Sequence, residues 1–238
     1  MTDSGSPLRT VGVLLAGGSG TRLGGEIPKQ LLEIAGRSVL EHSVAAMDAA
    51  CKIDEVLVVM HPDFIDEAKR AVLNGPYCKV SQVVAGGPSR SDSTCIAIAA
   101  LGSEECNVLL HDAVRPLVSQ RIIADTVDAL RRYRAVDVAV PSADTILVVD
   151  DGVITDIPSR HRIRRAQTPQ GFRLSVIRKA YELAGRDPDF HATDDCGVVL
   201  KYLPDEPIGV IDGSDDNIKI THPVDVVFAD SLLRSRRG

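Results

Sequence analysis

The most constraining feature of this 238-residue chain is an alternation of short apolar runs with longer segments of helical periodicity. Runs that are apolar throughout are typical of strands covered on both faces of a sheet. Strand–helix alternation predicts right-handed crossovers and a mostly parallel sheet, in a chain whose length suits one domain. We therefore expect a single α/β domain over 1–238, a Rossmann-like twisted sheet with helices on both faces. The apolar runs are 11–16, 55–60, 80–85, 107–110 and 135–140.

The alternation breaks after Pro141. Segments 145–149 and 153–157 flank Asp150-Asp151-Gly152, a pattern typical of a β-hairpin with an Asp-Gly turn. An arginine-rich stretch follows it, so we expect a projecting arm over about 142–170. Beyond the arm, the sequence predicts helices near 175–184, 193–201 and 222–233, and strands near 208–211 and 217–220.

Composition excludes several function classes. The net charge is -6 and aromatic residues make up 3% with no Trp, which argues against a nucleic-acid partner. No apolar run approaches the roughly 20 residues of a membrane span. The five cysteines are odd in number and dispersed, so we expect them to be reduced and mostly buried, in a cytoplasmic protein.

A glycine-rich segment, LLAGGSGTRL over 14–23, follows the first apolar run and precedes Pro28-Lys29-Gln30. Ligands of parallel sheets collect at the carboxyl ends of strands, where such loops lie. Glycines let backbone N–H groups approach a phosphate, and Arg22 and Lys29 can supply full positive charge. The Walker pattern is absent, and Leu23 stands where the dinucleotide-binding pattern needs its third glycine. A plain glycine-rich turn is the structural alternative.

Together with GGPSRSDS, HDAVRP, RRAQTPQGF, HATDD and DNIKITHP, this segment resembles the cytidylyltransferases that act on methylerythritol 4-phosphate and ribitol 5-phosphate. The motifs occur in the family's order across nearly the whole chain. The resemblance implies an enzyme that transfers CMP from CTP to a sugar-alcohol phosphate and releases pyrophosphate. An oxidoreductase would need the missing dinucleotide-binding pattern. An inactive nucleotide-binding module would be expected to lose Arg22, Lys29 or Asp112, all of which are present.

Three local spellings are closer to the ribitol branch: AGG at 16–18, HDAVR at 111–115 and VITDIP at 153–158. We therefore expect D-ribitol 5-phosphate as the acceptor, giving CDP-ribitol. The alternative acceptor is 2-C-methyl-D-erythritol 4-phosphate, a precursor in isoprenoid biosynthesis. Both are short phosphorylated polyols, and none of the three spellings has a physical link to the choice between them.

The resemblance also assigns roles to individual residues. It implies that Asp112 binds Mg²⁺ or another divalent cation, and that charge on the phosphates is stabilised by Arg22, Lys29 and Lys219. The acceptor phosphate would be bound by Arg160, Thr193 and Lys219. Arg160 is expected from the neighbouring subunit, because arms of this family embrace across a homodimer. The nucleotide would be bound by Ala16, Gly17, Gly18, Gly87, Arg90, Ser93 and Ala113.

Overall fold

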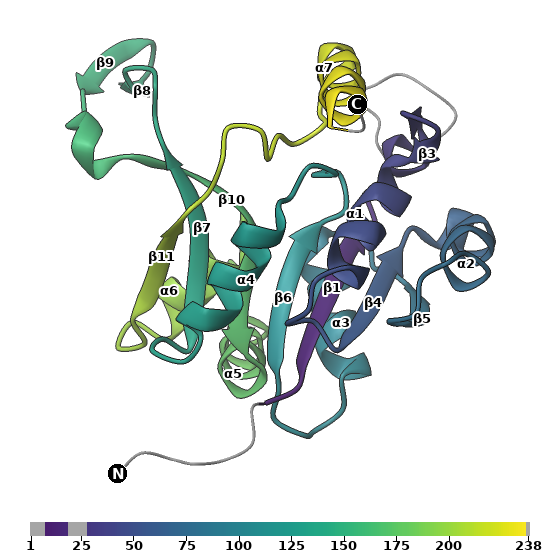
Figure 1. Cartoon of the computed structure of the whole chain (residues 1–238). Coiled ribbons are helices and arrows are strands. Elements are labelled where there is room, and N and C mark those ends of the chain that lie inside the picture. The colour runs from purple at the N-terminus through teal and green to yellow at the C-terminus, as the bar shows by residue number, and fades with distance from the viewer. Residues whose placement is uncertain (1–7, 19–27, 237–238) are drawn as a thin grey trace.

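The computed structural model describes residues 8–18 and 28–236, and its centre is a seven-stranded sheet in the order β11-β7-β10-β6-β1-β4-β5 (Figure 1). All neighbouring strands are parallel except β10, which runs antiparallel to both β6 and β7. This confirms the predicted mostly parallel α/β sheet. The strands are β1 (Thr10–Ala16), β4 (Glu55–Met60), β5 (Val80–Ala85), β6 (Asn107–Asp112), β7 (Ala135–Pro141), β10 (Arg164–Arg173) and β11 (Ile208–Asp212).

Helices cover both faces of the sheet because its strands are apolar on both sides. Val11, Val13 and Leu15 of β1 pack with α3 (Arg90–Ala100), α5 (Leu174–Ala184) and α6 (Asp195–Tyr202). Leu14 and Ala16 face the opposite way, toward α1 (Val39–Asp48), α2 (Ile65–Leu73) and α4 (Gln120–Ala129). The alternation along β1 therefore divides its apolar side chains between two cores.

A third, smaller apolar cluster joins the C-terminal helix to residues 32–39. Helix α7 (Pro223–Ser235) packs there through Ala229 against Ile34 of the ribbon β2 (Glu33–Ile34) and β3 (Arg37–Ser38). A capping box formed by Ser38 and Glu41 begins α1. Short 3₁₀ turns within the described residues are η2 (Lys29–Leu31), η3 (Pro62–Phe64) and η4 (Arg160–Arg162).

The predicted hairpin is present as β8 (Val148–Asp150) and β9 (Val153–Asp156), and it projects away from the sheet (Figure 1). Asp151 and Gly152 both have positive φ, at 49° and 80°, which is the backbone that an Asp-Gly turn of type I′ requires. The turn chemistry was therefore read correctly from the sequence.

The expected arm boundary at about 170 is wrong. Arg164–Arg173 form β10, which lies between β6 and β7 in the middle of the sheet, so the arm ends near 163. The sequence did not predict this strand, because proline and glycine are unfavourable inside a central strand and both occur in Thr168-Pro169-Gln170-Gly171. The structure accommodates them with a register shift between Gln167 and Gly171.

Two further expectations are wrong. Residues 217–220 form no strand; Asn217 is instead fully buried and donates to the carbonyl of Thr168 at 2.9 Å. The cysteines are not mostly buried, since Cys51, Cys78 and Cys95 are exposed free thiols. Within the described residues, no helix has both the length and the apolar character needed to cross a bilayer.

Candidate active site

A cavity of about 500 Å³ lies at the carboxyl ends of β1, β4, β5 and β6. Its volume lies within the range typical of sites for small molecules, roughly 300–1,000 Å³. Segments that lie far apart in the sequence meet at this edge of the sheet. The cavity brings together Gly17, Gly18, Lys29, Gly87, Arg90, Ser93, Asp112 and Lys219 from the set proposed from the sequence.

The floor of the cavity is a close approach of two glycine loops to the start of α3. A Cβ atom added to Gly17 or to Gly86 would lie 2.8 Å from the Ser93 Oγ atom, too close for an unstrained contact. The Ser93 hydroxyl donates to the Ser89 carbonyl and accepts from the Gly87 N–H. Ser93 therefore ties the second loop to the helix, and glycine at 17 and 86 leaves room for that tie.

Lys29 and Gln30 lie in the short turn η2 on one side of the cavity. The Lys29 side chain is buried, and its Nζ donates to the Ile220 carbonyl at 3.2 Å. Gln30 Nε2 donates to the carbonyls of Ala16 and Gly18, one on each side of Gly17. Gln30 was not among the residues proposed from the sequence, although it follows Lys29 directly in the motif. These contacts fix a lysine charge and the glycine segment relative to each other.

Asp112 is the centre of charge in the cavity and ends β6. Its Oδ1 accepts from Arg90 Nε at 3.2 Å, and its Oδ2 lies 2.7 Å from Lys219 Nζ. Burial opposes ionisation of this carboxyl, but the charges of Arg90 and Lys219 outweigh burial and hold the pKa of Asp112 well below its usual range. Asp112 is therefore an anion at neutral pH, with a cation on each oxygen.

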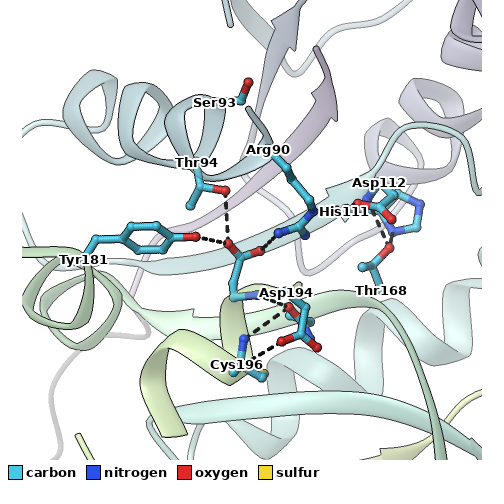
Figure 2. Close-up of polar contacts among 12 residues, drawn as sticks. Arg90, Ser93, Thr94, His111, Asp112, Thr168, Tyr181, Asp194 and Cys196 are labelled. Carbon is cyan, nitrogen blue, oxygen red and sulfur yellow. Dashed lines mark hydrogen bonds and ion pairs between the residues drawn. The ribbon is translucent and has the colours of Figure 1, made fainter. Parts of the chain in front are cut away.

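Behind Asp112, Arg90 makes a second ion pair (Figure 2). Its Nη1 lies 2.7 Å from Oδ2 of Asp195, a fully buried residue that begins α6. Oδ1 of Asp195 accepts from Thr94 Oγ1 at 3.0 Å and from the Tyr181 hydroxyl at 2.7 Å. Asp195 was not among the residues proposed from the sequence, because nothing in HATDD distinguishes a buried carboxylate from its neighbours.

The backbone of Asp112 is held by a chain of hydrogen bonds that explains the buried His111. His111 Nε2 lies 3.1 Å from the Arg115 carbonyl, so this nitrogen carries the proton, and Nδ1 accepts from the Thr168 hydroxyl. The same hydroxyl accepts from the Asp112 N–H at 3.0 Å. Burial lowers the pKa of His111 to about 4. This neutral, fully bonded ring has a structural role.

The donor set suits a cation that arrives with a nucleotide. Asp112 is the carboxylate that lines the cavity, and no group of three His, Cys, Asp or Glu side chains that could hold a metal is found across 8–18 and 28–236. Mg²⁺ is commonly held by one or two carboxylates together with substrate phosphates and water. One ionised carboxylate beside a cavity of this size fits that arrangement and does not fit an all-protein metal cage.

Other residues proposed from the sequence lie elsewhere. Arg22 falls outside the described residues. Ala16 and Ala113 are fully buried behind the cavity wall, where the Ala113 N–H donates to the Leu15 carbonyl. Thr193 is exposed just before α6, and Arg160 is exposed on η4, where it donates to Thr145 Oγ1. Neither of these two lines the cavity of its own chain.

Comparison with known proteins gives one consistent family. The family model described as 2-C-methyl-D-erythritol 4-phosphate cytidylyltransferase matches residues 10–235. A protein of that name from Thermobifida fusca is 50% identical over 234 residues, covering 95% of this chain and 94% of the relative. The solved structure of 4-diphosphocytidyl-2C-methyl-D-erythritol synthase from Anaerococcus prevotii has a TM-score of 0.84 at 32% identity, covering 95% of this chain and 99% of the other.

A different name occurs on one relative. The bifunctional ribulose 5-phosphate reductase/CDP-ribitol pyrophosphorylase Bcs1 of Haemophilus influenzae is 41% identical over 232 residues. The match covers 96% of this chain and 49% of that protein.

Proposed function

The chain belongs to the 2-C-methyl-D-erythritol 4-phosphate cytidylyltransferase family, and from this we propose that it transfers CMP from CTP to 2-C-methyl-D-erythritol 4-phosphate with release of pyrophosphate. The observation that best supports this choice of acceptor is the 50% identity, along almost the full length of both chains, to a protein of that name. The expectation of ribitol 5-phosphate is replaced, because the family model and this relative favour the alternative acceptor. The Haemophilus influenzae relative keeps ribitol 5-phosphate as the second candidate.

The charges around the cavity suit transfer between two anions. Phosphoryl-type transfer needs positioning and stabilisation of negative charge more than a protein nucleophile. Lys29, fixed by the Ile220 carbonyl, and Lys219 place two ammonium groups on the cavity wall. Lys29 would stabilise the phosphates of CTP. Lys219 would move away from Asp112 and contact the α-phosphoryl group and the acceptor. Arg22 is proposed as a further cation on the basis of the family motif.

Asp112 is proposed to hold Mg²⁺ or another divalent cation. When bound, such a cation screens the repulsion between the phosphates that must approach each other. The base and ribose would occupy the part of the cavity formed by Gly17, Gly18, Gly87 and Ser93. Backbone groups of Ala16 and Ala113 and the side chain of Arg90 are the remaining proposed nucleotide contacts.

We propose a homodimer in which the arm of one copy completes the site of the other. The hairpin projects from the sheet (Figure 1). Its apolar side chains are exposed, and such a surface favours burial by a partner. Arg160 lies on the same arm and would contact the acceptor phosphate of the partner copy, together with Thr193 of that copy. The exposed apolar residues of the arm are Ile146, Leu147, Val148, Val149, Val153, Ile154 and Ile157.

The test is a side-by-side assay of pyrophosphate release from CTP and Mg²⁺ with each polyol phosphate. We expect kcat/KM for 2-C-methyl-D-erythritol 4-phosphate to exceed that for ribitol 5-phosphate by at least about 100-fold, the scale of discrimination between substrates that differ by one small group. A preference for ribitol 5-phosphate would overturn the acceptor. If folded protein that binds CTP releases no pyrophosphate with either polyol phosphate, the result would support the inactive module.

A further inference from the structure

Asp195 is a buried carboxylate that the proposed reaction does not use. It lies behind Arg90, away from the cavity lining, and its exposed fraction is 0%. Three groups contact it: Thr94 and Tyr181 on Oδ1, and Arg90 on Oδ2. Burial and the charge of Asp195 raise the pKa of Tyr181, so its phenol stays a hydrogen-bond donor. Oδ1 is therefore held by hydrogen bonds from α3 and α5, and Oδ2 by the ion pair with Arg90.

A buried ion pair of this kind is weak evidence for a role in stability. Removing two charges from water costs several kcal/mol per ion, and apolar replacements are often as stable. Arg90 spans two carboxylates with different nitrogens, Nε on Asp112 and Nη1 on Asp195. Because the guanidinium is planar and rigid, fixing Nη1 also fixes the direction of Nε. The position of Asp195 is thus transmitted to the carboxylate at the cavity.

We propose that Asp195 is a positioning residue that acts through Arg90 to orient the Asp112 carboxylate and to limit the positive charge that faces it. With Asp195 in place, the charge of Arg90 is shared between two anions. Without it, the whole guanidinium charge faces Asp112 and competes with a divalent cation for the same carboxylate. The inference rests on the proposed role of Asp112 in holding that cation.

The experiment measures CTP binding by calorimetry, with and without Mg²⁺, in the full-length wild type and in Asp195→Asn. Asparagine keeps the side-chain volume and an acceptor for Thr94 and Tyr181 but removes the charge. We expect the strengthening of CTP binding by Mg²⁺ to fall about 10- to 100-fold in this variant, as for other residues that support a metal ligand. Binding of CTP without Mg²⁺ should not weaken, because Asp195 does not line the cavity and Arg90 keeps its charge in the variant. The kcat should fall while KM for the acceptor changes little.

Two further variants separate positioning from folding. Asp194→Asn removes the charge of the adjacent carboxylate, whose oxygens accept from Gln170 Nε2 and from the Gly197 N–H. This variant should keep the wild-type Mg²⁺ effect. Asp195→Glu restores the carboxylate and should recover part of the effect. Should Asp195→Asn fail to fold, Tyr181→Phe removes one of the bonds that fix Asp195, and should reduce the Mg²⁺ effect more modestly.

The outcomes are distinct. An unchanged Mg²⁺ effect in Asp195→Asn, or in Tyr181→Phe where that variant carries the test, overturns the inference. Equal weakening with and without Mg²⁺ also overturns it, because that is the result of a purely structural role. If the wild type binds CTP equally well with and without Mg²⁺, the proposed metal role of Asp112 is wrong, and the inference fails with it. The acceptor is absent from the binding experiment, so an error in the proposed acceptor leaves this result unaffected.

Discussion

The Nζ atom of Lys219 lies 2.7 Å from Oδ2 of Asp112, so the cavity holds its own counterions before any ligand enters. A triphosphate would draw the lysine away, and a cation would take its place on the carboxylate. Binding of nucleotide and metal would therefore exchange one set of ion pairs for another without leaving a buried charge unpaired. The proposed exchange can be tested by substitution of these side chains.

Lys219→Ala should lower kcat/KM by about 100-fold, which corresponds to the loss of one preorganised charge contact in a site of this kind. The fold should remain intact, because the lysine side chain is 40% exposed. Steady-state kinetics with circular dichroism would check both points. Lys201→Ala is the matched control, because it removes an exposed lysine that pairs with Asp187 at 2.9 Å outside the cavity. A variant at 219 that matches this control would contradict the assigned role.

Lys29→Ala should remove most turnover, by about 100- to 1,000-fold, while the protein stays folded. The physical reason is the loss of a buried positive charge, which the hydrogen bond to the Ile220 carbonyl holds in place at the cavity wall. Single-turnover kinetics at saturating CTP would separate the chemical step from binding. Near-normal turnover would show that this lysine does not stabilise the phosphates.

The sequence was sufficient to predict the parallel strands, because short apolar runs are typical of strands covered on both faces of a sheet, as β1, β4 and β6 are. It was also sufficient for the Asp151-Gly152 turn, whose positive φ angles follow from local chemistry. It failed at β10, where the local signal of Pro169 and Gly171 opposes a strand and tertiary pairing with β6 and β7 overrides it.

The site was only partly readable for a similar reason. Asp112 ends β6 and Gly17 directly follows β1, so the topology brings these motif residues to one edge of the sheet. Asp195 follows a loop, and its importance comes from Arg90, Thr94 and Tyr181, which lie far from it in the sequence. Long-range polar networks of this kind leave no periodic or local pattern in a single sequence.

Gly17→Ala should raise KM for CTP by about 10-fold or more with a smaller change in kcat. The new Cβ would stand 2.8 Å from Ser93 Oγ and push the glycine segment away from α3. Ser93→Ala removes that oxygen, so in the double variant part of the stability lost in Gly17→Ala should return. Urea denaturation of the two single variants and the double variant gives this coupling directly. Additive losses would show that the close approach to Ser93 is not the cause.

Asp137→Asn should stabilise the protein above pH 6 and leave its stability near pH 4 unchanged. Burial and the nearby charge of Asp194 raise the pKa of Asp137 from 3.8 to about 6. The folded state therefore holds its proton more tightly than the unfolded chain, and stability is lost as pH rises from about 4 through 6. Asparagine stays neutral and keeps an acceptor for Gln170 Nε2.

The gain at pH 7.5 should be about 1–2 kcal/mol, which allows for the partial exposure of this side chain. Urea denaturation at pH 4.5 and 7.5 would measure it, with the exposed Asp205→Asn as the control. Equal stability of wild type and Asp137→Asn at both pH values would contradict the raised pKa.

Mixed dimers provide the test of the shared site. Arg160→Ala and Lys29→Ala homodimers should each be inactive, since every site lacks one essential cation. After subunit exchange, half of the dimers should carry one of each chain, and one of their two sites would combine an intact Lys29 with an intact Arg160 from the other copy. Recovery of about one quarter of wild-type activity is therefore expected for a twofold symmetric dimer. Verified mixed dimers that stay inactive would show that Arg160 does not reach across, because a site built from one chain cannot be repaired by its neighbour.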